Sequence, residues 1–178
     1  KNFIRPFQMN KEQFEIRPIL PSDKEGMQEG ITLLSNESRR QRFFFSRKNL
    51  TEKELTFFTE VDQIHHLAFV AISHSTPLPT PAGSIRCIRS STRAEYAELA
   101  ITIIDRFQGQ GLGLELMETL SLAAQAQKIT HFYGDFQANN SRMLKLLEKY
   151  CVKHNIPKES FLLIHKSGSF LYFEMALT

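Results

Sequence analysis

The chain has 178 residues, about the size of one domain with a single hydrophobic core. Hydrophobic residues make up 42% of it and charged residues 23%, and its formal net charge of +3 is too low to indicate nucleic-acid binding without a concentrated basic patch. The sequence shows no signal peptide and no apolar run near the ~20 residues that span a bilayer, so we expect a cytoplasmic protein. Cys87 and Cys151 lack the Cys or His neighbours of a zinc site or a disulfide framework, and we expect no metal.

No repeat, low-complexity tract or Pro/Gly-rich linker divides the chain. We therefore expect a single domain over residues 13–178 and a loose N-terminal extension over residues 1–12. Residues 14–19 alternate apolar and charged side chains, which predicts a first strand. The Pro-Ser-Asp sequence that follows is typical of a helix start and predicts a helix that ends at Leu34.

Residues 38–48 hold five basic side chains around the triplet Phe43, Phe44 and Phe45. Such a segment could form an anion-binding patch for an acidic partner or a phosphate. The interpretation we favour is a solvated helix face whose phenylalanines enter the core. Residues 51–60 come next and begin with Thr and Glu at capping-box spacing, which predicts a short helix.

The rest of the chain alternates between strand and helix patterns. Apolar runs bounded by turn residues predict strands over residues 66–73, 83–89, 98–104, 131–136, 161–165 and 169–177. Apolar side chains at helical spacing predict two amphipathic helices over residues 112–127 and 139–150. Together with the earlier elements, this order predicts a mixed α/β fold of six to seven strands flanked by about four helices.

The stretch DRFQGQGLGLEL joins a strand to a helix through three glycines. This arrangement forms an anion site, because the first helical amides are unpaired and glycines let the backbone reach the ligand. A P-loop is excluded because Leu114, not lysine, follows Gly113, and a dinucleotide GxGxxG loop starting at Gly109 fails at the same leucine. The pattern that remains is Gln108-x-x-Gly111-x-Gly113 after an apolar strand.

This loop, with the strand ELAITII before it and the helix NNSRMLKLLEKY downstream, resembles the GNAT superfamily of acyl-CoA N-acyltransferases, whose pyrophosphate loop reads Gln/Arg-x-x-Gly-x-Gly/Ala. The segments IRPILPSD, SNESRRQRFF and GSIRCIR are similar, at lower specificity, to the acetyltransferase domain of Pat-type protein lysine acetyltransferases. The resemblance extends from Phe14 to about Val152 and implies the GNAT fold, with a central mixed, mostly antiparallel sheet. It also implies acetyl-CoA as co-substrate and a protein lysine as the favoured acceptor.

The family's motifs assign residues of this chain to the parts of the coenzyme. Backbone groups of Ile101, Thr102 and Ile103 would pair with the pantetheine as an added strand would. The loop that would hold the pyrophosphate consists of Gln108, Gly109, Gln110, Gly111, Leu112 and Gly113. Asn140, after the following strand, would contact the pantetheine arm, and Met143 in the same helix completes the coenzyme-binding set.

Glu98 matches the glutamate of the Ala-Glu-Phe-Ala segment in Pat-like domains, and the resemblance makes it the candidate general base. Such a carboxylate could take the proton of the acceptor amine directly or through a water molecule. Glu95 is the nearest rival. Alternatively, Glu98 is a surface carboxylate that pairs with a neighbour such as Arg86 or Arg93.

One departure from the family's pattern leaves the general acid open. Many GNAT enzymes have a general-acid tyrosine seven positions after the asparagine, where this chain has Leu147, and Tyr150 cannot be assumed to replace it. The leading hypothesis is an N-acetyltransferase. The alternatives are a catalytically silent acyl-CoA-binding regulatory domain and an acetyltransferase for small amines, with nucleic-acid binding by the basic segment ranked low.

Overall fold

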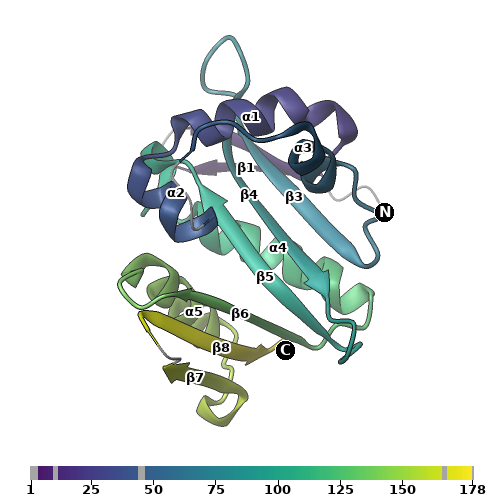
Figure 1. The fold of residues 1–178 in the computed structure, drawn as a ribbon, viewed down its shortest axis with the longest axis vertical. Helices are drawn as coiled ribbons and strands as arrows, with labels where there is room; N and C mark the ends of the chain where they lie inside the picture. Colours follow the sequence, from purple (N-terminus) through teal and green to yellow (C-terminus); the bar gives the residue numbers. More distant parts are fainter. Residues whose placement is uncertain (1–3, 10–11, 44–46, 166–167, 178) are drawn as a thin grey trace.

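The computed structural model describes residues 4–9, 12–43, 47–165 and 168–177, which form one sheet with helices on both faces (Figure 1). The sheet has eight strands in the order β1-β2-β3-β4-β5-β6-β8-β7. Neighbouring strands run antiparallel, except β5 and β6, which are parallel. The strands are β1 (Arg5–Met9), β2 (Glu12–Pro18), β3 (His66–Ser73), β4 (Thr80–Arg89), β5 (Tyr96–Ile103), β6 (His131–Gln137), β7 (Phe161–His165) and β8 (Phe170–Ala176).

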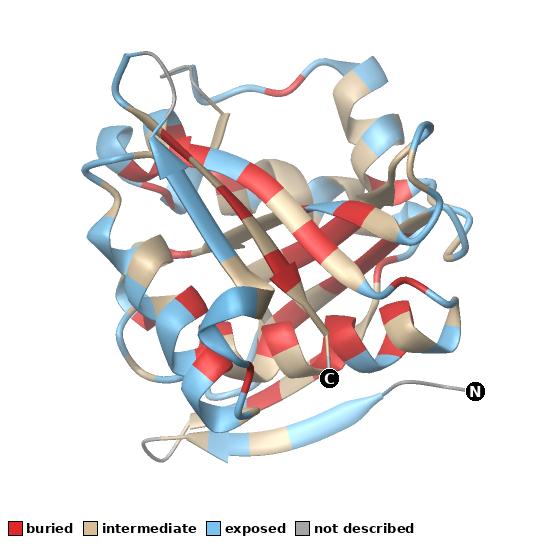
Figure 2. Cartoon of the chain, turned by 90° about the horizontal axis from the view of Figure 1, so that it is seen from below, coloured by how far each residue is buried: buried red, intermediate tan, exposed pale blue. Residues whose placement is uncertain are grey.

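Five α-helices cover the sheet within the described residues. They are α1 (Lys24–Leu33), α2 (Asn36–Phe43), α3 (Glu52–Thr59), α4 (Leu112–Ala126) and α5 (Ser141–Lys153), with short 3-10 turns η1 (Pro21–Asp23), η2 (Asp105–Phe107) and η3 (Lys158–Ser160). Figure 1 shows α4 and α5 behind the sheet and the first three helices on the opposite side. Leu116, Met117 and Leu120 of α4 are fully buried, and Figure 2 shows that the buried residues gather in the central strands and on the helix faces turned toward them.

The expectation of a mixed fold with a mostly antiparallel sheet is confirmed, with one strand and one helix more than the sequence predicted. The additional strand is β1, so the loose character expected for residues 1–12 is wrong for residues 5–9. β1 pairs antiparallel with β2, and the rings of Phe7 and Phe14 stack with their centroids 5.1 Å apart. The division into an extension and a domain stays a prediction.

The helix favoured for the basic segment is present as α2, but its basic face is not solvated throughout. Arg39 is only 2% exposed and donates hydrogen bonds to the carbonyl oxygens of Ile31 and Leu34. Its positive charge therefore caps the C-terminal end of α1. Arg47 pairs with Glu54 of α3. Phe43 is half-buried against the core, and residues 44–46 lie outside the described residues.

The central feature of the sheet is the point at which β5 and β6 separate, which we call the fork. These strands pair over three residues only, from Tyr96↔His131 to Glu98↔Tyr133. Figure 1 shows them diverging toward the side where α2 and α5 lie. Past the fork, β5 stays paired with β4 up to Ile103 but has no strand partner on its other edge within the described residues.

Two glycines provide a matched test of the packing. A methyl group at Gly83 of β4 would lie 2.8 Å from the carbonyl oxygen of Thr102, whereas one at Gly26 of α1 would meet no atom within 4 Å. We expect Gly83→Ala to lower the free energy of unfolding by about 1–3 kcal/mol, because the β5 backbone must shift. Gly26→Ala should raise it by about 0.5–1 kcal/mol, because alanine loses less backbone entropy in a helix. Urea denaturation measures both changes, and changes of the same sign would contradict the prediction.

Candidate active site

The glycine-rich loop lies between the end of β5 and the start of α4, as predicted. Gly109 has φ 73° and Gly111 has φ 103°, values in the left-handed region that side chains disfavour. Gly111 is the N-cap of α4, and no side chain caps the helix there. Within the described residues, the amides of Gly109, Gly111, Leu112 and Gly113 have no hydrogen-bond acceptor. Free amides at the positive end of a 15-residue helix make a site for an anion such as a pyrophosphate.

Gly113 is required for a different reason, since its backbone is ordinary helix. A methyl group at this position would lie 3.1 Å from Cδ1 of Ile103 and 3.3 Å from both δ carbons of Leu146. The absence of a side chain therefore lets α4 begin in close contact with the end of β5 and with α5. This packing places the loop beside the edge of β5 that has no strand partner.

Hydrogen bonds from polar side chains hold the loop against β5 and α2. The Gln108 amide Nε2 donates to the carbonyl oxygen of Ile103 at 2.8 Å and lies 3.3 Å from the Ser38 hydroxyl, which donates to Asp105 Oδ1 at 3.0 Å. Partial burial acts to raise the pKa of Asp105, but hydrogen bonds from Ser35 and Ser38 outweigh it and leave the pKa below its ordinary value. Gln108 thus fixes the loop to β5 and α2 through its side chain.

The β1–β2 hairpin contacts the loop and the first turn of α4. Arg5 pairs with Glu115 of α4 at 3.2 Å, and Arg106 pairs with Glu12 at 2.7 Å. A methyl group at Gly111 would lie 3.2 Å from the Met9 sulfur, so the hairpin also limits the space around the loop. The N-terminal strand is therefore part of the wall of the anion site.

Asn140 caps α5, with its Oδ1 accepting from the amide of Met143 at 3.1 Å. Since α5 follows β6, this cap lies at the β6 side of the diverging strands, and Met143 is half-buried against the core. The structure thus brings the predicted β5 segment, loop and helix cap around the diverging strands (Figure 1). Contacts of these residues with a coenzyme stay a prediction.

Glu98 lies at the fork and is exposed. Within the described residues its carboxylate makes no hydrogen bond or ion pair. The two arginines suggested as structural partners are engaged elsewhere. Arg93 pairs with Glu174 at 2.7 Å, while Arg86 donates to the carbonyl oxygen of Phe58 at 3.1 Å. The rival Glu95 is also exposed, but it precedes β5 and lies farther from the fork.

Two guanidinium groups set the electrostatics of the sheet face that carries Glu98. Burial lowers the pKa of Arg42 to about 10, an effect that the negative charge of Glu98 opposes, and its buried Nε has no hydrogen-bond partner among the described residues. Burial and, to a smaller extent, the positive charge of Arg42 together lower the pKa of Arg86 to about 9. Burial and Arg86 together lower the pKa of His66 to about 4, so its Nε2 accepts from Arg86 at 3.1 Å. Sequence reasoning missed this cluster, because nothing in the pattern distinguishes Arg42 from its exposed neighbour Arg40.

The two residues of α5 considered for the general acid both face the core. Leu147 is 0% exposed. Tyr150 is 1% exposed, its ring stacks on His154 at 4.3 Å, and burial raises its pKa despite a hydrogen bond with Ser121. Neither side chain supplies a proton donor at the fork.

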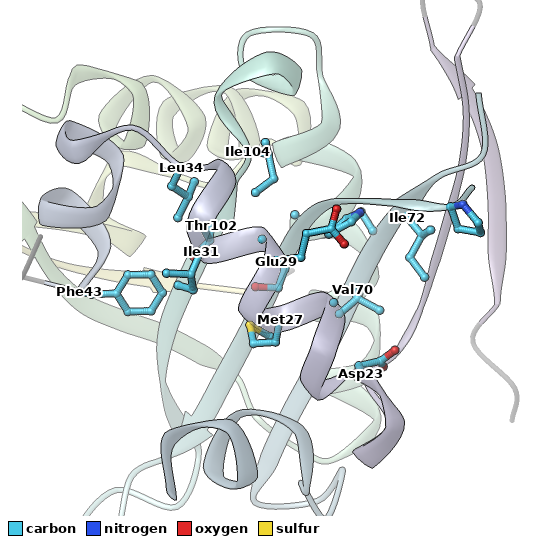
Figure 3. A pocket seen from close by; sticks show the side chains of 17 residues that line it. Asp23, Met27, Glu29, Ile31, Leu34, Phe43, Val70, Ile72, Thr102 and Ile104 are labelled. Carbon is cyan, nitrogen blue, oxygen red and sulfur yellow. The ribbon is translucent and has the colours of Figure 1, made fainter. Parts of the chain in front are cut away.

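A pocket of about 160 Å³ lies between α1 and the sheet (Figure 3). Glycines of α1 leave the space, and its walls are mostly apolar, with Met27, Val70 and Ile104 among them. Of its acidic side chains, Asp23 forms a two-point ion pair with Arg17 at 2.7 and 2.8 Å. Because the pocket is mostly apolar and Asp23 is occupied by an ion pair, we assign the chemistry to the fork and not to this pocket.

The remaining candidates contribute no reactive group at the site. Cys87 and Cys151 are buried, and burial raises the pKa of Cys87 to about 12, which keeps its thiol protonated. Among the described residues, no group of three or more His, Cys, Asp or Glu side chains is placed to hold a metal ion. The helices described here are too short or too polar to cross a membrane.

Comparison with known proteins matches residues 13–151 to the acetyltransferase (GNAT) domain family. Acetyltransferase Pat of Mycolicibacterium smegmatis is 32% identical over 138 residues, which cover 78% of this chain and 40% of that protein. An acetyltransferase of Pseudomonas aeruginosa is 30% identical over 131 residues, which cover 74% of this chain and 70% of that protein. The chain thus spans less than half the length of the M. smegmatis relative.

Solved structures share the fold. The GNAT domain of S. lividans PAT superposes with a TM-score of 0.82 at 21% identity, over 98% of this chain and 97% of that one. YncA of Salmonella typhimurium, solved with its cofactor acetyl-CoA, superposes with a TM-score of 0.67 at 14% identity, over 93% and 94% of the two chains. The forked sheet and the glycine loop thus define the class of the acyl-CoA N-acyltransferases. Within that class, this chain belongs to the GNAT family of acetyl-CoA-dependent acetyltransferases.

Gly109 and Gly168 offer a matched test of the loop, because both have positive φ and an added methyl group would meet no atom within 4 Å at either. Alanine should strain the backbone by a similar amount, about 1–2 kcal/mol, at both positions. We expect Gly109→Ala to weaken coenzyme A binding roughly tenfold, because strain of that size in the loop misdirects its amides. Gly168→Ala, in the distant turn before β8, should leave the affinity unchanged. Isothermal titration calorimetry with coenzyme A measures both, and equal affinities of the two variants would contradict the assignment of the loop.

Proposed function

We propose that the domain transfers the acetyl group of acetyl-CoA to the side-chain amine of a protein lysine, with Glu98 as general base. The observation that carries this proposal is the position of Glu98, exposed at the fork and without a partner among the described residues. The resemblance of the sequence motifs to Pat-type protein lysine acetyltransferases favours a protein acceptor, and the M. smegmatis relative is named acetyltransferase Pat.

The donor would lie along the unpaired edge of β5. The free amides of the loop would hold the pyrophosphate, and backbone groups of Ile101, Thr102 and Ile103 would pair with the pantetheine as a strand pairs with its neighbour. The thioester would then reach the fork, where a β5 amide near Ile101 would stabilise the oxyanion. Asn140 and Met143 would border the pantetheine from the side of α5.

The acceptor must lose a proton before it attacks. A lysine amine has an ordinary pKa near 10.4, so its free base at pH 7 costs roughly 4–5 kcal/mol. Glu98 would take the proton, directly or through water, a step that typically contributes ~10² to 10⁴ in rate. The buried guanidinium groups of Arg42 and Arg86 act in the same direction, because positive charges nearby disfavour an ammonium and favour the neutral amine.

Exposed apolar side chains on the sheet face that carries Glu98 favour a large acceptor. β6, β8 and β7 continue the sheet beyond the fork, and on the last of these strands Leu162 and Ile164 are each 46% exposed. They lie on the same sheet face as Glu98, because Leu162 is paired with Glu174, Glu174 with Tyr133, and Tyr133 with Glu98. A lysine on a protein surface has access to such a face, whereas a small amine would need a closed pocket to gain affinity.

The test is acetyl transfer by the wild type, Glu98→Gln and Glu95→Gln. With a lysine-containing peptide as acceptor and thiol release as the readout, we expect Glu98→Gln to lower kcat by ~10² to 10⁴. Coenzyme A affinity should stay unchanged, because the base lies apart from the loop. Glu95→Gln, an exposed carboxylate of the same type, should keep the wild-type rate.

Each alternative has its own outcome in that assay. Coenzyme A binding without turnover on peptides, polyamines or aminoglycosides would identify a silent acyl-CoA-binding domain. Turnover on small amines with none on peptides would replace the protein acceptor. A larger loss in Glu95→Gln than in Glu98→Gln would move the general base to Glu95.

A further inference from the structure

Acetyl transfer also needs a proton donor for the departing thiolate, and the α5 positions discussed above provide none. Leu147 and Tyr150 are buried away from the fork. We infer that Tyr133 of β6 is the general acid that protonates the sulfur of coenzyme A as it leaves. This inference rests on the proposed function, with Glu98 as base.

The register of the sheet places Tyr133 beside Glu98. The two residues form the last pair of the parallel ladder, after which β5 and β6 diverge. Paired residues on neighbouring strands point to the same face, and their backbones lie about 4.8 Å apart. The carboxylate and the phenol therefore stand on opposite sides of the point where the strands divide, on one face of the sheet. Phe132, the preceding residue of β6, points to the other face and is fully buried.

The hydroxyl of Tyr133 is free, while the other tyrosine hydroxyl on this part of the sheet is engaged. Tyr133 is half-buried, and its hydroxyl has no hydrogen-bond partner within the described residues. Tyr172 of β8 donates to Glu174 Oε1 at 2.5 Å and accepts from Arg93 at 3.3 Å. The Glu174 carboxylate is thereby occupied by Tyr172 and Arg93. Of the two carboxylates that flank Tyr133 across the sheet, Glu174 and Glu98, only Glu98 is left to exchange a proton with it.

The ring of Tyr133 is held in place by a fixed cation. The Arg93 guanidinium lies 5.4 Å from the Tyr133 ring centroid and 3.8 Å from the Tyr96 ring centroid, and its ion pair with Glu174 anchors it. Tyr96 in turn stacks on His131 at 4.3 Å. Because these contacts restrict the orientation of the Tyr133 ring, its side chain would need little rearrangement to donate a proton to a sulfur atom at the fork.

Glu98 and Tyr133 together account for the proton taken from the amine and the proton given to the sulfur. The neutral amine, whose ammonium proton has already passed through Glu98 to water, attacks the thioester carbon; a C–N bond forms and the carbonyl electron pair moves to oxygen. Glu98 then takes a second proton, from the nitrogen of this intermediate. The pair on oxygen re-forms the carbonyl, the C–S bond breaks with its electron pair going to sulfur, and Tyr133 gives its hydroxyl proton to that sulfur. Protonated Glu98, a far stronger acid than a phenol, returns the proton to the phenolate beside it and restores both groups.

The first test removes one hydroxyl group at a time. Tyr133→Phe should lower kcat with acetyl-CoA and a lysine peptide by about 10²-fold, the lower end of general-acid effects, because a thiolate leaves without help more easily than most groups. The dissociation constant of coenzyme A should stay the same. The control is Tyr96→Phe, which removes a hydroxyl two pairs earlier in the ladder, on the same face, and should keep the wild-type rate.

An acetyl-CoA analogue with oxygen in place of the thioester sulfur distinguishes proton donation from damage to the fold. An alkoxide is a stronger base than a thiolate and depends more on a proton donor, so the Tyr133→Phe loss should be about tenfold larger with the oxyester. The same loss with both donors, or an equal loss in Tyr96→Phe, overturns the role of Tyr133. A slow Glu98→Gln with a fully active Tyr133→Phe also overturns it and leaves the proposed function intact, whereas a wild type without turnover overturns the proposed function itself.

Discussion

The separation of β5 from β6 is the constraint on which the rest of the site depends. A parallel ladder that continued past Glu98 would satisfy the edge of β5 with hydrogen bonds and leave it nothing to offer a ligand. Gly134 is the first residue of β6 after the last pair, and a methyl group there would lie 3.3 Å from the carbonyl oxygen of Leu99 and 3.2 Å from the Phe173 ring. One local change in strand pairing thus creates both the donor edge and the place where the proposed acid and base meet.

The shape of the loop next to that edge is set by its own glycines and by the hydrogen bonds around it. Positive φ at Gly109 and Gly111 and the helix contact at Gly113 are separate requirements that three glycines meet. The hydrogen bonds from Gln108 and around Asp105 hold the loop against β5 and α2. Binding an anion there costs little additional ordering, and this favours affinity without new contacts. The acceptor side is built differently, from side chains on a sheet face with much exposed surface.

The parts that the sequence predicted well are those with a local physical signature. The helix of α4 and the glycine turn before it each depend on neighbouring residues, and each lies where the pattern placed it. The burial of Arg42 near Glu98 could not be predicted, because it depends on the packing of α2 against β5, two segments that are far apart in the sequence. The relation of Tyr133 to Glu98 depends on strand register, and short apolar runs do not specify which residues of two parallel strands face each other.

The hairpin of β1 and β2 changes where the coenzyme site begins along the chain. The family match starts at residue 13, but the partners of Glu115 and Arg106 are Arg5 and Glu12, and Met9 closes the space beside the loop. A protein trimmed to the family boundary would keep the strand fork and lose this support. Donor affinity measured on such a fragment would then describe a loosened loop. Arg5, Met9 and Glu12 thus support the side of a site whose recognisable motif lies about a hundred positions away.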